Sequence, residues 1–218
     1  SYQEIINYYY DRASLADLNL LLDSEDRFSA RIERGLKFKE IRQISWSGPR
    51  VITVLDFDLK NDNLQLKPVL AQGVVPGRED LADLIKKHSA LAGVNGGYFH
   101  YSGRPLGLLY IRGELISEPL YNRSALLVSE NNQISFARVD WAGELFVESV
   151  AEEIKLDGVN RELNSDELIL FNHYYGPRLP ALSAGQYDIV VRDKRVLGVE
   201  NKAGAETAIP PDGFVLRF

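Results

Sequence analysis

The sequence predicts an α+β fold with a strand-rich, mixed and largely antiparallel sheet and few helices. From about Phe28 onward, short segments rich in β-branched and aromatic residues alternate with hairpin-length turns. Only one internal segment has helical periodicity, whereas a doubly wound parallel sheet would need a helical crossover between successive strands. The turns that support this interpretation are Asn61–Asn63, Arg112-Gly113, Asn131-Asn132 and Asp193-Lys194.

The N-terminal residues predict a helical arm. Apolar side chains recur at roughly helical spacing over residues 1–25, which contain neither Gly nor Pro, and Ser14 is a suitable N-cap for a second helix. We therefore divide the chain into a helical arm over residues 1–27 and a strand-rich domain over residues 28–218.

The first part of this domain predicts a hairpin and a helix. Arg50–Leu59 alternates apolar and polar residues, and Leu64–Leu70 is predicted to pair with it across the Asn61–Asn63 turn. Arg78–His88 predicts a short amphipathic helix packed on one face of the sheet. The apolar side of this helix consists of Leu81, Leu84 and Ile85.

Short apolar segments predict the remaining strands. They are Leu91–Val94, Leu106–Ile111, Glu114–Ile116, Ser124–Val128, Gln133–Val139, Leu145–Val150, Ile154–Leu156, Leu168–Asn172, Asp188–Val191, Arg195–Val199 and Phe214–Phe218. Because Phe214–Phe218 is apolar and has no polar tail after it, we expect it to pair with another chain or with a further part of the same domain.

Composition excludes several classes of function. The chain has 218 residues, a net charge of −6 and no Cys, so disulfides, thiolate zinc sites, iron–sulfur clusters and a Cys nucleophile are ruled out. The acidic surplus predicts no nucleic-acid partner, and no apolar run approaches the ~20 residues of a membrane span. We expect no cofactor and no metal, since hairpin alternation and turn preference account for Asp56, Asp58 and Asp62 better than a calcium site does.

The sharpest local feature is the segment Asn95–Phe99. An apolar stretch enters Gly96 and Gly97 and leaves through Tyr98 and Phe99. Consecutive glycines allow close backbone approach, and their free N–H groups can cradle an anion. The alternative is a simple hairpin turn, because Asn-Gly is a common turn dipeptide.

Two further groups of residues suit phosphate or sugar recognition. Arg123 stands at the entrance of a predicted strand, where its guanidinium could hold a phosphate in a two-pronged contact. His173 ends another strand and is well placed for proton transfer. The alternatives are a solvated surface Arg and a buried structural His. The polar and aromatic residues associated with them are Asn160, Arg161, Tyr174 and Tyr175.

These motifs, in this order, resemble the phosphodiester glycosidase family, which includes N-acetylglucosamine-1-phosphodiester α-N-acetylglucosaminidase and many bacterial envelope proteins. The resemblance covers residues 28–218, and His173-Tyr174 departs from the family pattern. The segments that carry it are Ala92–Phe99, Pro105–Gly107, Ile111–Ile116, Arg123, Gly158–Arg161, Asp166–Phe171, Tyr175-Gly176 and Ile209–Leu216.

The resemblance implies hydrolysis of a sugar-1-phosphate diester, without a cofactor, by a secreted or cell-envelope protein that acts on glycans such as exopolysaccharides. The family domain continues past these motifs into an Asp-Gly-Gly-Gly-Ser segment, so we expect the chain to be its N-terminal part, with the signal peptide outside these residues. The implied catalytic residues are Asn95, Arg123 and His173. The implied substrate-binding residues are Gly96, Gly97, Tyr98, Phe99, Asn160, Arg161, Tyr174 and Tyr175.

A second hypothesis is a non-catalytic envelope module that binds a polysaccharide or a protein partner. An enzyme needs its polar residues to converge on one cleft, whereas a binding module can leave them scattered. We therefore predict, for the enzyme, that Asn95–Phe99, Arg123 and Asn160-Arg161 line one concave surface with His173 at its edge.

Overall fold

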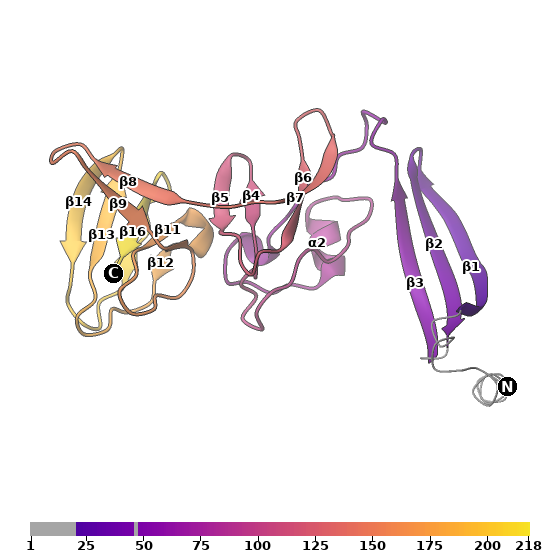
Figure 1. The fold of residues 1–218 in the computed structure, drawn as a ribbon, viewed down its shortest axis with the longest axis horizontal. Helices are drawn as coiled ribbons and strands as arrows, with labels where there is room; N and C mark the ends of the chain where they lie inside the picture. The colour runs from indigo at the N-terminus through magenta and orange to yellow at the C-terminus, as the bar shows by residue number, and fades with distance from the viewer. Residues whose placement is uncertain (1–20, 46–47) are drawn as a thin grey trace. The chain divides into compact units, whose positions relative to one another are not determined.

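The computed structural model describes residues 21–45 and 48–218. The chain separates into two compact units, Ser1–Leu66 and Lys67–Phe218, and each is described by itself (Figure 1). This division falls well after residue 27, where the sequence predicted a boundary. Within the described residues, no helix has both the length and the apolar character needed to cross a membrane.

The first unit contains a three-stranded antiparallel sheet in the order β1-β2-β3. Its strands are β1 (Leu21–Glu33), β2 (Leu36–Ser45) and β3 (Gly48–Phe57). Gly35 makes the tight turn between β1 and β2 at a φ of +83°, a left-handed conformation that glycine adopts without steric cost. Across these two strands the rings of Phe28 and Phe38 lie 6.0 Å apart.

The predicted helical arm is wrong for residues 21–27, which form the first part of β1. Pairing with β2 begins at Leu21 and continues along the ladder. These cross-strand hydrogen bonds outweigh local helical spacing, because a short helix without tertiary packing is only marginally stable in water. The rest of the predicted arm, residues 1–20, lies outside the described residues.

Leu64–Leu70, predicted as a hairpin strand, belongs to no strand. After β3 the chain turns instead, since Asn61 donates its backbone N–H to Asp58 O and its side-chain amide to Arg34 O. Leu64 then packs against Gly35 and is 4% exposed. Burial of Leu64 at this turn therefore prevents the chain from running back along β3.

The second unit is built around a five-stranded sheet in the order β10-β11-β16-β13-β14 (Figure 1). β10 and β11 are parallel and the other neighbours are antiparallel, so the sheet is mixed and largely antiparallel, as the sequence predicted. The strands are β10 (Gly158–Val159), β11 (Ile169–Asn172), β13 (Asp188–Arg192), β14 (Arg195–Glu200) and β16 (Gly213–Arg217). The core cluster of this unit consists of Ile169, Phe171, Leu179, Ile209 and Val215.

The expectation that the last strand pairs with another chain is wrong. β16 occupies the middle of the sheet, where β11 covers one of its edges and β13 covers the other. Its apolar side chains are buried within this chain, since Val215 is fully buried and Leu216 is 2% exposed. Phe218, directly after the strand, stacks on Tyr187 with ring centroids 5.4 Å apart.

The remaining strands form two-stranded ladders rather than one continuous sheet. Three of these ladders are hairpins near the predicted positions, and positive φ angles at Arg112 and Asn132 mark two of the predicted turns. The pairs are β4 (Leu109–Ile111) with β5 (Glu114–Ser117), β6 (Ser124–Val128) with β7 (Ile134–Arg138), β8 (Gly143–Val147) with β9 (Glu152–Leu156), and β12 (Arg178–Leu179) with β15 (Thr207–Ala208).

The predicted internal helix is present as α2 (Leu81–Lys87), with 3₁₀ turns η2 (Ala71–Gly73) and η3 (His173–Tyr175) elsewhere in the unit. It does not cover a sheet face, and it contains no buried residue. Its apolar side lies over Gly93, where an added Cβ would come within 3.0 Å of Ile85 Cγ1. Leu91–Val94, predicted as a strand, is irregular chain packed near this helix.

Candidate functional site

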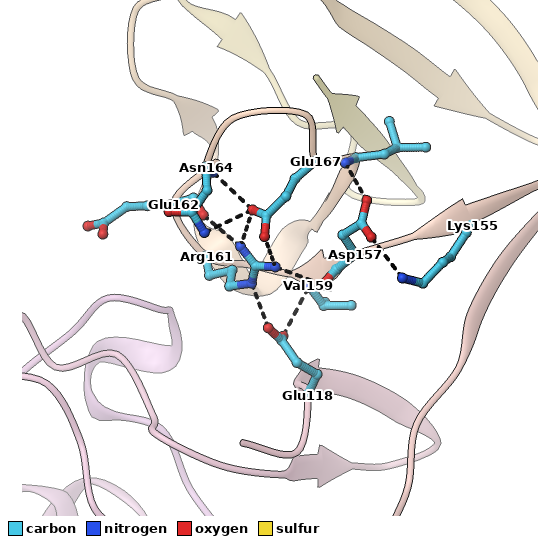
Figure 2. Close-up of polar contacts among 9 residues, drawn as sticks. Glu118, Lys155, Asp157, Val159, Arg161, Glu162, Asn164 and Glu167 are labelled. Atoms are coloured by element: carbon cyan, nitrogen blue, oxygen red, sulfur yellow. Dashed lines mark hydrogen bonds and ion pairs between the residues drawn. The ribbon is translucent and has the colours of Figure 1, made fainter. Parts of the chain in front are cut away.

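Arg161, two residues after the end of β10, is the centre of a polar cluster in the second unit (Figure 2). A guanidinium has five N–H groups, and each of those of Arg161 meets an acceptor of this chain. Nε donates to Glu118 (2.7 Å), while Nη1 and Nη2 donate to the two carboxylate oxygens of Glu167 (2.6 and 3.0 Å). The other two bonds go to the backbone carbonyls of Asp157 (2.7 Å) and Glu162 (3.0 Å).

Burial and hydrogen bonding shift the pKa values of the ionisable groups in this cluster. The side chains of Arg161 and Glu118 are 12% and 7% exposed. Burial by itself would lower the pKa of Arg161, but hydrogen bonds to Glu167 and Glu118 outweigh it and raise that pKa. The hydrogen bond from Arg161 lowers the pKa of Glu167 to about 2. The backbone N–H of Leu168, helped by Lys155, lowers the pKa of Asp157.

These shifts predict an acid-sensitive contribution to stability. The pKa of Glu167 is about 2 in the folded chain against an ordinary 4.5, so the unfolded chain binds more protons between these values. The contribution of Glu167 is therefore complete above pH 4.5 and is lost as the pH falls toward 2. Urea unfolding across this range should show a shallower pH dependence for Glu167→Gln than for the parent chain. Glu130→Gln, on an exposed turn, is the matched control, and equal slopes in all three proteins would contradict the prediction.

The side chain of Asn160 is also buried and hydrogen-bonded to this chain. It is 1% exposed, and its φ of +51° is a conformation that Asn tolerates better than most residues. Its side-chain amide donates to Ile116 O (3.1 Å) and Asn172 Oδ1 (2.8 Å), and its Oδ1 accepts from the backbone N–H of Asn172. Asn172 in turn donates to Leu115 O, so the two asparagines bind β10 and β11 to β5.

The roles of Asn160 and Arg161 therefore differ from those the resemblance implies. Both residues have their donors occupied by this chain, so neither is free to hold a substrate group in this arrangement. They act as positioning residues, because Asn160 joins β10 to β5 and β11, and Arg161 joins the chain segments that contain Glu118 and Glu167. Glu118 contributes to the same junction by also accepting the N–H of Val159 (3.0 Å).

The Asn-Gly-Gly loop and Arg123 do come together. The guanidinium of Arg123 lies over the ring of Tyr98 at 4.8 Å and over the ring of Tyr121 at 5.0 Å. The backbone of Leu106 joins the same group, since its N–H donates to Tyr98 O (2.8 Å) and its carbonyl accepts from Arg123 Nη1 (3.0 Å). Arg123, predicted at a strand entrance, directly precedes β6.

The loop itself offers unpaired backbone donors. Within the described part of the chain, the N–H groups of Asn95, Gly96 and Gly97 donate no hydrogen bond. Neither glycine has a positive φ, and a Cβ added to either would meet nothing within 4 Å. The glycines therefore keep this surface open rather than making a tight turn. Phe99 leaves the loop, bridges to Pro105 and remains 54% exposed.

His173 lies in η3, held there because Asn172 Oδ1 accepts the N–H of Tyr174. Its Nδ1 is 3.6 Å from Glu114 Oε2, and its ring lies 4.2 Å from that of Tyr174. Tyr175 packs edge-on against the core residue Phe171, and burial raises its pKa. Tyr175 is thus a core-packing residue, and His173 is a partly exposed partner of a carboxylate.

A pocket of about 600 Å³ lies beside the Arg161 cluster. Its lining includes Tyr121, which connects it to the Arg123 group, and Trp141, whose indole packs on Gly143 so closely that an added Cβ would lie 2.4 Å from Cζ2. Arg104 also lines it and has no side-chain partner among the described residues. Neither Asn95 nor His173 is part of the lining.

The pocket also holds carboxylates. Glu144 and Glu162 line it, and the structure gives neither side chain a hydrogen-bond or ion-pair partner within its described residues. Glu118 lines it as well, but Arg161 occupies that carboxylate. Among the described residues, the charged groups of the lining without a partner are therefore the Arg104 guanidinium and the carboxylates of Glu144 and Glu162, next to the aromatic rings of Tyr121 and Trp141.

Of the residues that line this pocket, sequence reasoning had singled out only Arg161. The only local signal was Trp141, a large aromatic side chain in an otherwise polar loop between two predicted strands. Glu118 and Arg161 are 43 positions apart, so no short motif contains both. Of the predicted site residues, Arg161 lies in the wall of the pocket and Arg123 contacts the pocket residue Tyr121.

No family model and no curated protein matches this chain. Among solved structures, the chain is similar to a crystal structure of a hypothetical protein from Synechocystis, with a TM-score of 0.74 and 21% sequence identity. The alignment covers 84% of this chain and 35% of that one, so the chain spans about a third of the length of the structure it matches. At this identity the likeness shows a shared fold.

Proposed function

We propose that the chain contributes the substrate site of a hydrolase that cleaves sugar-1-phosphate diesters, in a secreted or cell-envelope protein. The observation that carries the proposal is the stacking of Arg123 over Tyr98 and Tyr121. This contact places a cation between the open Asn-Gly-Gly loop and the aromatic rim of the pocket. It supports the interpretation that the family resemblance implies, in which a phosphate and a sugar are held side by side.

The phosphate would lie at the loop. Arg123 uses one N–H group on Leu106 O and keeps its others for an anion. The unpaired backbone N–H groups of Asn95, Gly96 and Gly97 add further donors. Such preorganised donors stabilise the negative charge that develops on a departing phosphate, and a protein with a net charge of −6 must concentrate them locally.

The sugar would occupy the pocket. A volume of about 600 Å³ is within the range of small-ligand sites, and aromatic walls suit the apolar faces of sugar rings. The indole of Trp141 packs closely on Gly143, and this contact restricts its movement before a sugar stacks on it. Arg104, Glu144 and Glu162 supply polar groups for sugar hydroxyls.

The chemistry is a hydrolysis in which water attacks the anomeric carbon and the bond from that carbon to the phosphate oxygen breaks. The phosphate leaves with the electron pair as a monoester, so it needs less protonation than an alkoxide would. Glu144 and Glu162 are the carboxylates available to accept the proton of the attacking water. We assign no step to His173, whose ring faces Glu114.

Arg123→Ala should lower kcat/KM for a sugar-1-phosphate diester at least tenfold, because hydrogen bonds to charged groups contribute about 1.5–3 kcal/mol each. Asn95→Ala should lower it as well. Release of free N-acetylglucosamine from its 1-phosphate methyl diester is the measurement. Arg112→Ala, an exposed arginine on the β4–β5 turn, is the matched control. Unchanged kinetics in Arg123→Ala and Asn95→Ala would contradict the proposal.

The second candidate function is a polysaccharide-binding module without catalysis. It is favoured by the exposure of Tyr98, Tyr101 and Tyr121, each about three quarters accessible (75%, 79% and 74%). Exposed aromatic patches of this kind mark interaction surfaces. Binding of an anionic polysaccharide that weakens in Tyr98→Ala and Tyr121→Ala, with no sugar released from any diester, would favour this candidate over the hydrolase.

A further inference from the structure

β14 is an edge strand with an apolar surface that its own chain does not cover. In the five-stranded sheet, β13 pairs with one edge of β14, and among the described residues no strand pairs with the other. Val196, Leu197 and Val199 are 63%, 61% and 60% exposed. An open edge with exposed apolar side chains is a template for pairing with another strand.

A bulge in β14 decides which of its side chains share a face. Val196 pairs with Val191 and Val199 pairs with Ile189, with Leu197 as the extra residue between them. Ile189 and Val191 are two positions apart in β13 and lie on the same face. Val196 and Val199 therefore share that face, although their spacing in an unbroken strand would put them on opposite faces.

The pairing with β13 also shows which face of β14 carries its charged end residues. Arg195 pairs with Arg192 and Glu200 pairs with Asp188. Because Asp188 and Arg192 share the other face of β13, Arg195 and Glu200 both lie on that face of β14. The bulge thus gives the strand one face with two valines and another face with a cation at one end and an anion at the other.

We propose that two copies of this chain associate by antiparallel pairing of their β14 strands, about a two-fold axis between Leu197 and Gly198. In this register Arg195 faces Glu200 of the second copy, and Val196 faces Val199 of the second copy. Two-fold symmetry repeats every one of these contacts.

Charge complementarity is the reason for choosing a second copy as the occupant. Opposite charges directly across an antiparallel pair are favourable and like charges are unfavourable. β14, Arg195–Glu200, read backwards places an opposite charge against Arg195 and a valine against Val196. The faces of the strand also agree with this register, because Arg195 and Glu200 lie on one face of β14 and Val196 and Val199 lie on the other. This association is independent of the proposed hydrolase activity.

Two charge-reversal variants test the proposal by sedimentation equilibrium of the 218-residue chain over a micromolar concentration series. The parent chain should form a dimer. Arg195→Glu alone should raise the dissociation constant about tenfold or more, because Glu then faces Glu twice, and Glu200→Arg alone should do the same. An equimolar mixture of the two variants should dimerise again, since each interface then pairs Glu with Arg.

The mixing experiment also separates a lost interface from a lost fold, because an unfolded variant could not restore association. A parent chain that stays monomeric over the whole series would overturn the proposal. So would a dimer that both single reversals leave unchanged, or two monomeric variants that fail to associate when mixed. Capture of a different polypeptide at this edge by a monomeric parent chain would likewise assign β14 to another occupant.

Discussion

Replacing Asp188 by alanine should lower the free energy of unfolding by about 3–5 kcal/mol, since breaking a buried ion pair leaves an uncompensated charge. Asp188 is fully buried, and Arg217 donates to its two oxygens from Nε and Nη2, each at 2.7 Å. The pair joins β13 to β16 at directly opposed positions. Chemical denaturation at neutral pH is the measurement.

Two further variants make this result interpretable. Arg192→Ala removes the half-exposed pair between β13 and Asp212, in the turn before β16, and should cost no more than about 1 kcal/mol. If Asp188→Ala does not fold, the double variant Asp188→Leu/Arg217→Met should still fold, because apolar residues of similar volume can replace a buried pair. Equal stability losses in Asp188→Ala and Arg192→Ala would contradict the argument.

Arg161→Ala should have an effect of similar size, about 3–5 kcal/mol, because it leaves the carboxylates of Glu118 and Glu167 without their cation. Arg161→Lys should rescue only part of the loss, since an ammonium cannot reproduce five planar N–H contacts. Gly158→Ala should also be harmful, because its Cβ would lie 2.4 Å from Arg161 Nε and displace a guanidinium that is held on every side.

The control for this cluster is Lys155→Ala. Lys155 bonds to Asp157 at 3.1 Å, but its side chain is 81% exposed, so its removal should cost less than about 1 kcal/mol. A second readout reports on the pocket. Trp141 fluorescence, measured in a Trp46→Phe background, should change more in Arg161→Ala than in Lys155→Ala. Both residues line the pocket with Trp141, but the side chain of Arg161 is 12% exposed and that of Lys155 is 81% exposed. Unaltered stability and fluorescence in Arg161→Ala would overturn this account.

The candidate site was only partly predictable. A strand entrance and a glycine loop identified Arg123 and Asn95–Phe99, and the structure brings Arg123 onto Tyr98 of that loop. Asn160 and Arg161 were predicted as substrate-binding residues, but partners up to 44 positions away occupy them. A polar side chain that is free and one that is buried and bonded look identical in a sequence, because the difference lies entirely in what surrounds it.

What the sequence by itself determined is the local part of the fold. Turn residues such as Asn131-Asn132 and Asp193-Lys194 define hairpins because their backbone preferences act within a few residues. Only the tertiary structure decided the rest: strand identity for residues 21–27, the central place of β16, and the bulge that aligns Val196 with Val199. These outcomes depend on cross-strand hydrogen bonds and burial, which are free-energy contributions from residues distant in sequence, and no local pattern contains them.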